Sequence, residues 1–278
     1  MTVTRLHTHR VEKPWGRHKL WPGFEDAPEG GDPVGEVWFQ EKGEDPVLLV
    51  KYLFTSEKLS IQVHPDDAYA RAHGYKRGKS EAWVILDAEP DSTIALGMRD
   101  VYSQEQLRQG AIDGSIEDMV DWKSVKADDA IFSPAGTVHA IGAGLTVIEV
   151  QQNVDLTYRL YDYGRPRELH LDDGIAVSNP VPYVAPFVPM EAERGRRILV
   201  DSDAFVMERW TREGSGTFKA APGRPVWLVP VSGTGRADGE AIGPGGVWLA
   251  DGPFELVLDE GSDVIVAYPD KGVLHSPW

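Results

Sequence analysis

The chain lacks several features, and each absence narrows the class of protein. It contains no cysteine, which excludes disulfides and thiolate metal sites and is typical of a reducing compartment. No run approaches the roughly 20 apolar residues of a membrane helix. Residues 1–10 carry no apolar core of signal-peptide length. We therefore expect a soluble, cytoplasmic protein without a membrane partner.

Positive charge is also scarce. The 278 residues include 28 Lys and Arg against 44 Asp and Glu, which gives a formal net charge of −16. A protein of this sign repels polyanions, so we expect no nucleic-acid partner. A small anionic substrate remains compatible if local cations surround it. The length suits one large or two smaller domains with a sizeable core, and either a monomer or a homodimer.

Helical patterns are few, and 29 glycines and 20 prolines divide the chain into short apolar runs. Short strands separated by turns predict a sandwich, jelly roll or barrel. Only three short helices are expected: residues 65–75, where Asp66 and Asp67 suit the first turn, a helix capped by Ser103, and residues 115–120. The strand-like runs are residues 47–54, 59–63, 81–86, 130–132, 146–150, 226–231, 247–249, 254–258 and 263–267.

A proline-rich stretch predicts how the chain is divided. Residues 178–189 hold four prolines, which suits an extended connector better than a helix or a central strand. We place a boundary there, between residues 1–184 and a second β-domain of residues 185–278. The second part has a single histidine, His275, so we expect the chemistry in the first part.

Polar residues at alternate positions of apolar strands indicate a site. Ser60, Gln62 and His64 should share one strand face, because side chains two apart in a strand point the same way. Two further segments carry similar residues: Lys79, Glu81 and Trp83 in one, and His139, at the end of Pro-Ala-Gly-Thr-Val-His, in the other.

Metal binding is the hypothesis that unites these segments. His64, His139 and Glu81, with Gln62 as a further candidate, offer nitrogen and oxygen donors. This donor set suits one Zn²⁺, and also Fe²⁺, Mn²⁺ or Co²⁺. Taken singly, each residue could have a structural role instead. Trp83 suits a core position, Lys79 a solvated strand edge, and Arg159 a scaffold pair with Asp155 or Asp162.

Taken together, the motifs resemble the type I phosphomannose isomerases of the cupin superfamily, in their short bacterial form. The similarity covers about the first 175 residues, in the family's order. It rests on Lys-Pro-Trp-Gly at residues 13–16, Gly-Glu-Val-Trp at 35–38, Leu-Val-Lys-Tyr-Leu at 49–53, and residues 59–67, 78–83, 134–139 and 151–165.

The resemblance implies a mainly β fold. It is a cupin jelly roll with short helical insertions that binds one metal, followed by a second, smaller cupin-like β-domain without a metal site. It also implies a mannose-6-phosphate isomerase, which interconverts mannose 6-phosphate and fructose 6-phosphate through an enediol. The sugar phosphate would be the small-molecule partner.

The resemblance also assigns roles within the site. His64, Glu81 and His139 are the implied metal ligands, with Gln62 as a fourth. Arg159 matches the family's active-site arginine and Lys79 the lysine of its Lys-x-Glu motif, so we expect both to be catalytic. Glu36 is a competing base. The implied phosphate contacts are Ser60 and Arg165, to which we add Lys51.

One departure from the family pattern concerns ring opening. Longer members carry a histidine just before that lysine, where this chain has Gly78. Ring opening must then use another group. The helical insertion, at residues 102–122, is also smaller than in the long eukaryotic form.

Two other functions remain open for a metal cupin. An Fe²⁺ dioxygenase would use a similar ligand set, but it needs no wall of cations such as Lys79, Arg159 and Arg165. A non-catalytic cupin that binds sugar phosphates would need no complete ligand set.

Overall fold

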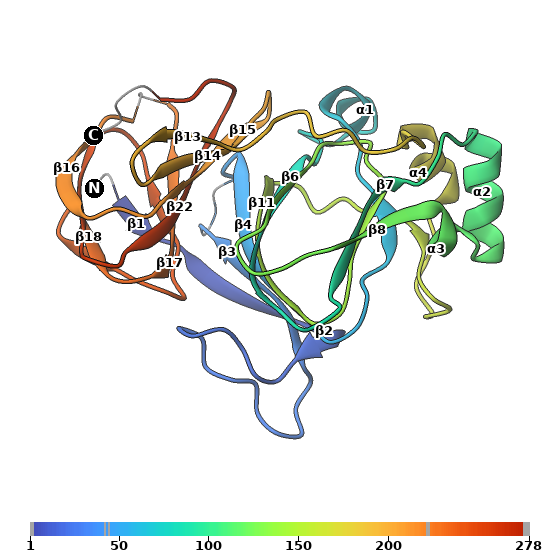
Figure 1. The fold of residues 1–278 in the computed structure, drawn as a ribbon, viewed down its shortest axis with the longest axis horizontal. Helices are drawn as coiled ribbons and strands as arrows, with labels where there is room; N and C mark the ends of the chain where they lie inside the picture. Colours follow the sequence, from blue (N-terminus) through green and yellow to red (C-terminus); the bar gives the residue numbers. More distant parts are fainter. Residues whose placement is uncertain (1–2, 42, 44, 221–222, 275–278) are drawn as a thin grey trace.

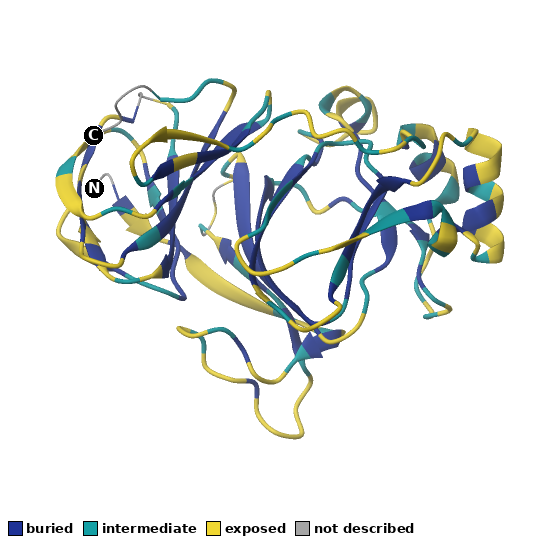
Figure 2. Cartoon of the chain, in the orientation of Figure 1, coloured by how far each residue is buried: buried dark blue, intermediate teal, exposed yellow. Residues whose placement is uncertain are grey.

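The computed structural model describes residues 3–41, 43, 45–220 and 223–274, so His275 lies outside the described residues. Sheets and helices are stacked in layers across the long axis of the molecule (Figure 1). The short helices lie at one end, the sheets of the first half come next, and the sheets of the second half form the other end (Figure 1). The strands that form the centre are mostly buried (Figure 2).

Two antiparallel sheets form the first half of the chain. The six-stranded sheet has the order β2 (His7–Arg17), β3 (Val34–Gln40), β4 (Leu48–Thr55), β11 (Leu145–Gln152), β6 (Glu81–Ala88) and β9 (Ala130–Ser133). The five-stranded sheet has the order β12 (Tyr158–Tyr161), β5 (Ile61–Val63), β10 (His139–Ile141), β7 (Thr93–Met98) and β8 (Val120–Ser124).

The central strands of the six-stranded sheet, β4, β11 and β6, are buried on both faces, which explains their apolar sequences, whereas the edge strand β2 is largely exposed. Every residue of β4 is buried. Val50, Tyr52 and Phe54 point toward the second half, whereas Leu53 packs inside the first barrel and Lys51 lines a cavity there. Because side chains alternate along a strand, one face of β4 packs in the core and the other face partly lines the cavity.

The three expected helices are present. Ser103 forms a capping box with Gln106 at α2 (Gln104–Asp113), as the sequence predicts. Asp66, which was expected in the first turn, is instead the N-cap of α1 (Asp67–Ala72). The third is α3 (Ile116–Met119). A fourth helix, α4 (Leu171–Val177), was not predicted. It has no side-chain cap, and packing of its apolar residues under the five-stranded sheet stabilises it.

The second half is strand and turn. Its seven-stranded sheet has the order β1 (Val3–Arg5), β20 (Trp248–Ala250), β17 (Val226–Ser232), β22 (Asp263–Pro269), β15 (Phe205–Trp210), β14 (Arg196–Asp201) and β13 (Met190–Glu193). The four-stranded sheet has the order β16 (Gly214–Phe218), β21 (Phe254–Leu258), β18 (Gly235–Ala237) and β19 (Glu240–Ile242). The N-terminal strand β1 therefore belongs to a sheet of the second half.

One hydrophobic core joins the two halves. It contains residues of the six-stranded sheet, such as Tyr52 and Phe132, together with Phe205, Trp227 and Ile265 of the seven-stranded sheet. The rings of Phe132 and Phe205 meet edge to face with centroids 5.9 Å apart.

The predicted extended connector is confirmed. Pro182 forms a bridge with Gly97 at the edge of β7, and the Met98 amide donates to the Val181 carbonyl at 3.0 Å. The division into domains at residue 185 stays a prediction. Among the described residues, no helix has the length and apolar character needed to cross a membrane.

Candidate metal centre

Three buried side chains from neighbouring strands meet inside the first barrel. His64 follows β5 directly, Glu81 begins β6 and His139 begins β10. His139 Nε2 lies 3.0 Å from Glu81 Oε1, and His64 Nε2 lies 3.3 Å from Glu81 Oε2. One ligand atom of each lies within 4.8 Å of the others, and each residue is about 1% exposed.

The polar atoms of this cluster fit a metal ion. Both ring nitrogens of His64 and Glu81 Oε2 are buried and have no hydrogen-bond partner among the described residues, which is costly unless another ligand satisfies them. His139 Nδ1 lies 2.9 Å from the Thr137 carbonyl, which can only accept. The Nδ1 proton is therefore donated there, and Nε2 is left with its lone pair toward Glu81.

The electrostatics of the cluster keep the ligands in their metal-binding forms. Burial, and then the charge of Lys79, lower the pKa of His64 to about 3, so its imidazole is neutral. Burial acts to raise the pKa of Glu81, but the charge of Lys79 holds it well below its usual range. Lys79 Nζ lies 3.3 Å from Glu81 Oε2.

Gln62 and Ser60 lie beside the cluster on the expected strand face. The Ser60 hydroxyl donates to Gln62 Oε1 at 3.0 Å, and Gln62 Nε2 lies 3.3 Å from His139 Nε2. The amide oxygen is thus engaged by Ser60. Gln62 as a metal ligand stays a prediction that requires rotation of this amide.

A cavity of about 380 Å³ opens beside the cluster, inside the first barrel. Its wall carries many ionisable side chains, both predicted and unpredicted. The predicted residues among them are Ser60, Gln62, Lys79, Lys51, Arg159 and Glu36. The ionisable residues that sequence analysis missed are His9, Lys13, Glu149, Asp155 and Arg167.

Lys51 lies in a buried row of charges, and its predicted phosphate contact is not supported. Its Nζ is 3.4 Å from Glu149 Oε2 and 3.7 Å from Glu36 Oε2, and it lies over the Trp38 ring. Burial acts to lower the pKa of Lys51, but these two carboxylates raise it. A lysine held by two buried carboxylates is already neutralised.

The sequence could have indicated Glu149. Glu149 lies opposite both Lys51 and Trp83 in the sheet, and Trp83 Nε1 donates to its carboxylate at 3.0 Å. Side chains alternate between the two faces along residues 145–152, and this alternation places Glu149 on the face that lines the cavity. Trp83 is fully buried in the core of the barrel, which agrees with the core position expected for it from the sequence.

Arg159 and Arg165, only six residues apart, differ in position. Arg159 lies opposite Gln62 and lines the cavity. Arg165 does not line it: its guanidinium donates to the Lys58 carbonyl at 2.7 Å, pairs with Asp162 at 3.0 Å and lies over the Tyr163 ring, and its phosphate contact stays a prediction. The turn after β12 directs Arg165 away.

Gly78 is required by packing. A Cβ at this position would lie 2.4 Å from the carbonyl carbon of Asp66 and 2.6 Å from the amide nitrogen of Asp67. The Gly78 amide also donates to Asp67 Oδ1 at 2.8 Å. A histidine cannot occupy this position without displacing the start of α1.

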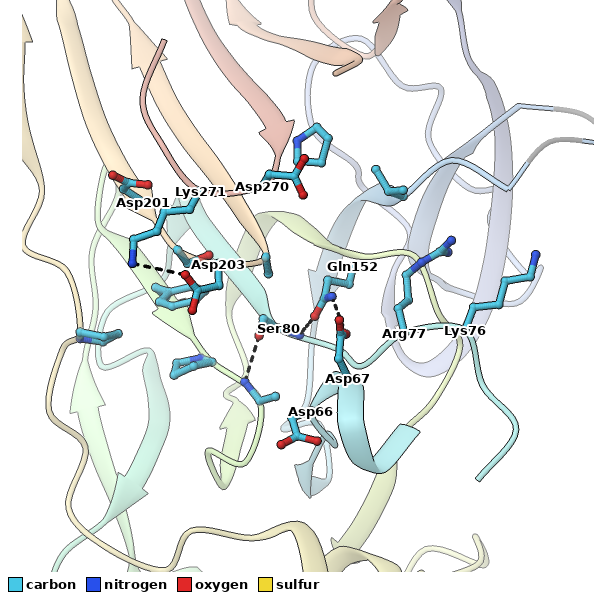
Figure 3. Close-up of a pocket in the computed structure, with 18 of the residues that line it drawn as sticks. Asp66, Asp67, Lys76, Arg77, Ser80, Gln152, Asp201, Asp203, Asp270 and Lys271 are labelled. Carbon is cyan, nitrogen blue, oxygen red and sulfur yellow. Dashed lines mark hydrogen bonds and ion pairs between the residues drawn. The ribbon is translucent and has the colours of Figure 1, made fainter. Parts of the chain in front are cut away.

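A larger cavity, of about 610 Å³, opens between the two halves. Figure 3 shows acidic and basic side chains together on both sides of it, with Lys271 facing Asp203 and Gln152 linking Ser80 to Asp67. None of the predicted site residues lines it. The chemistry is therefore concentrated at the smaller cavity.

Comparisons with known proteins identify the family of the chain. No protein-family model matches the chain. It is 36% identical over 211 residues to the mannose-6-phosphate isomerase of Streptococcus mutans, covering 72% of this chain and 66% of that one. It is 36% identical over 234 residues to the mannose-6-phosphate isomerase ManA of Bacillus subtilis, covering 77% of this chain and 73% of that one.

Solved structures give the same result. The mannose 6-phosphate isomerase of Bacillus subtilis superposes with a TM-score of 0.82 and 25% identity, over 96% of this chain and 99% of that one. A zinc-bound mannose 6-phosphate isomerase superposes with a TM-score of 0.72 over 97% of this chain and 100% of that one, and at 14% identity it supports the fold alone. The expected fold class is confirmed.

Proposed function

The chain belongs to the mannose-6-phosphate isomerase family, and from this premise we propose that it interconverts mannose 6-phosphate and fructose 6-phosphate. The observation that carries the proposal is the buried cluster of His64, Glu81 and His139 beside a cavity lined by cations. Aldose–ketose isomerisation moves a proton between C1 and C2 through an enediol. It needs a proton carrier and positive charge close to the two oxygens.

We propose that His64, Glu81 and His139 hold one divalent metal, with Zn²⁺ as the native ion. Two imidazole nitrogens and a carboxylate with unsatisfied, buried donor atoms suit zinc and leave room for further ligands. When bound, such an ion supplies a Lewis acid that withdraws electron density from the sugar oxygens.

Lys79 is our proposed proton carrier. It is buried, it lines the cavity, and its Nζ lies 3.3 Å from Glu81. Glu36 is the weaker candidate, because Trp38 Nε1 donates to its carboxylate at 2.6 Å. Burial acts to raise the pKa of Glu36, but Lys51 and this hydrogen bond lower it, which makes the carboxylate a poorer base.

Arg159 is our proposed source of fixed positive charge near the enediol oxygens. Its position opposite Gln62 on β12 brings it to the metal side of the cavity. Fixed cations in a site from which water is excluded stabilise developing negative charge without reorganisation. Ser60, on the same face as Gln62, hydrogen-bonds within the site and is retained as a polar contact for the substrate.

We also propose that the two domains differ in function. Residues 1–184 carry the catalytic site, and residues 185–278 form a β-domain without a metal. We place the protein in the cytoplasm, as a monomer or homodimer without nucleic-acid or membrane partners, because it lacks cysteine and carries a net charge of −16.

The test is a coupled assay on the zinc-loaded protein. Mannose 6-phosphate should be converted to fructose 6-phosphate in preference to glucose 6-phosphate or free mannose, in air and under anaerobic conditions. Chelation should abolish turnover and zinc should restore it. Binding of the sugar phosphate without turnover by fully metallated protein would overturn the proposal and favour a binding cupin.

A further inference from the structure

Three arginines follow one another on β12 and the turn after it, and two of them, Arg165 and Arg167, share the carboxylate of Asp162. Asp162 is 2% exposed. Its oxygens accept from Arg167 Nε and Nη2, both at 2.6 Å, and lie 3.0 Å from Arg165 Nη2. A single negative charge cannot neutralise two guanidinium groups, and Arg159 adds a third nearby.

Only two of these arginines face the cavity. Arg159 and Arg167 line it, whereas Arg165 is directed to the Lys58 carbonyl and to Glu57, at 3.8 Å. Arg159 and Arg167 therefore bring two guanidinium groups to a wall that also carries the carboxylates of Glu36, Glu149 and Asp155.

Arg159 is poorly compensated. Its guanidinium donates to the Glu168 carbonyl at 3.2 Å, and within the described part of the chain it forms no ion pair within 4.0 Å. Burial, and then the charge of Arg167, lower the pKa of Arg159. Two like charges held close together on a cavity wall favour an anion between them.

Arg167 keeps donors available for such an anion. Asp162 accepts hydrogen bonds from Nε and Nη2 of Arg167, whereas Arg167 Nη1 donates to no other described residue. The side chain is 30% exposed, so it lies at the outer part of the cavity, whereas Arg159 lies opposite Gln62, beside the metal cluster.

The lysines of the cavity are less available. Lys51 is held between Glu36 and Glu149, Lys79 lies 3.3 Å from Glu81, and Lys13 lies 3.9 Å from Glu36. Each of them lies within 4.0 Å of a carboxylate through its single nitrogen, and Lys13 and Lys51 share Glu36, whereas Arg167 keeps Nη1 besides the two nitrogens that Asp162 engages.

We infer that Arg167 binds the phosphate group of the sugar phosphate, in the place that the sequence motif gives to Arg165, whereas Arg159, on the metal side of it, faces the reacting end of the same substrate. Guanidinium groups bind phosphate oxygens through paired, charge-assisted hydrogen bonds. Binding at the outer cavity would orient C1 and C2 toward the metal cluster. The inference rests on the proposed function and names its phosphate site.

The test compares Arg167→Met with Arg165→Met and with Arg108→Met, a matched loss of charge at an arginine that pairs with Asp172 outside the cavity. Arg167→Met should raise KM for mannose 6-phosphate about tenfold or more, as expected from loss of a hydrogen bond to a charged group. It should weaken binding of inorganic phosphate to a similar extent, measured by calorimetry on the full-length protein with and without metal. Arg165→Met and Arg108→Met should change both within about twofold.

Unchanged KM and phosphate affinity in Arg167→Met, or a larger loss in Arg165→Met, would overturn the inference. Arg167→Lys keeps the charge and should fall between wild type and Arg167→Met, which decides the question if the methionine variant does not fold. A wild-type protein that binds phosphate but does not turn over mannose 6-phosphate would refute the proposed function alone.

Discussion

His139 is prepared for metal binding by its own backbone surroundings. The Thr137 carbonyl, 2.9 Å from Nδ1, fixes the tautomer, and Glu81 Oε1 lies 3.0 Å from Nε2. His64 differs, because neither of its ring nitrogens has a hydrogen-bond partner among the described residues. Both histidines can therefore offer a ring nitrogen to a metal, but only the His139 ring is held in place by a hydrogen bond to the backbone.

His139→Ala should remove bound zinc and turnover together, because a site of two remaining ligands holds zinc weakly. Metal content by atomic spectroscopy and the coupled assay check this. His73→Ala is the control, since His73 stacks on Tyr69 in the exposed C-cap of α1. An active His139→Ala protein with full metal content would refute the ligand assignment.

The depressed pKa of His64 predicts how stability depends on pH. Its pKa falls from the ordinary value of 6.5 to about 3 on folding, mainly through burial. Between these values the unfolded chain binds a proton that the folded chain does not, so stability falls as pH decreases below 6.5. In metal-free protein this group should contribute a slope of up to about 1.4 kcal/mol per pH unit.

Urea unfolding of metal-free wild type and His64→Gln, at pH 6.5 and about pH 5, measures this slope. The variant should lose less stability over that interval than the wild type. Equal losses in the two proteins would show that His64 is not the titrating group.

At the scale of elements, the ends of strands place the site. The cluster forms where β5, β6 and β10 begin or end, and β12 adds Arg159 opposite Gln62. His64 and His139 are 17 and 58 residues away from Glu81 along the chain, and the fold brings their Nε2 atoms to 3.3 and 3.0 Å from its carboxylate oxygens. Rigid strands hold such side chains more firmly than loops do.

The junction of α1 and β6 depends on a residue without a side chain. Gly78→Ala should destabilise the protein by about 1–3 kcal/mol, because a Cβ would overlap the backbone of residues 66–67. Gly243→Ala is the control, since the nearest atom to its Cβ lies 4.0 Å away. Denaturant unfolding of both variants checks this, and equal stability would contradict the close approach.

At the scale of the whole molecule, the two halves share one core. Phe205 is fully buried and meets Phe132 across the interface. The N-terminal strand also crosses over, because β1 pairs with β20. The halves therefore depend on each other for burial of their apolar faces.

Phe205→Ala should lower stability by about 3–5 kcal/mol and should shift one unfolding transition that includes both halves. Calorimetry measures this, with Val257→Ala on the partly exposed face of β21 as the control. Two separate transitions, of which only one moves, would show that the halves fold independently.

The sequence by itself determined the strand-rich architecture, the helix cap at Ser103 and the candidate residues of the metal cluster. These features depend on local patterns: the alternation of Ser60, Gln62 and His64, the cap at Ser103, and apolar runs between turns. A resemblance over many motifs added the family, which the comparisons confirm.

Only the tertiary structure decided which cations face the cavity. Arg165 and Arg167 are two residues apart, and no local pattern shows that a turn directs the first to a backbone carbonyl and the second to the cavity wall. The same holds for Lys51, whose charge is offset by Glu149 on an adjacent strand, and for β1. The physical reason is that pairing of charges and strands depends on residues distant in sequence, which only the folded chain brings together.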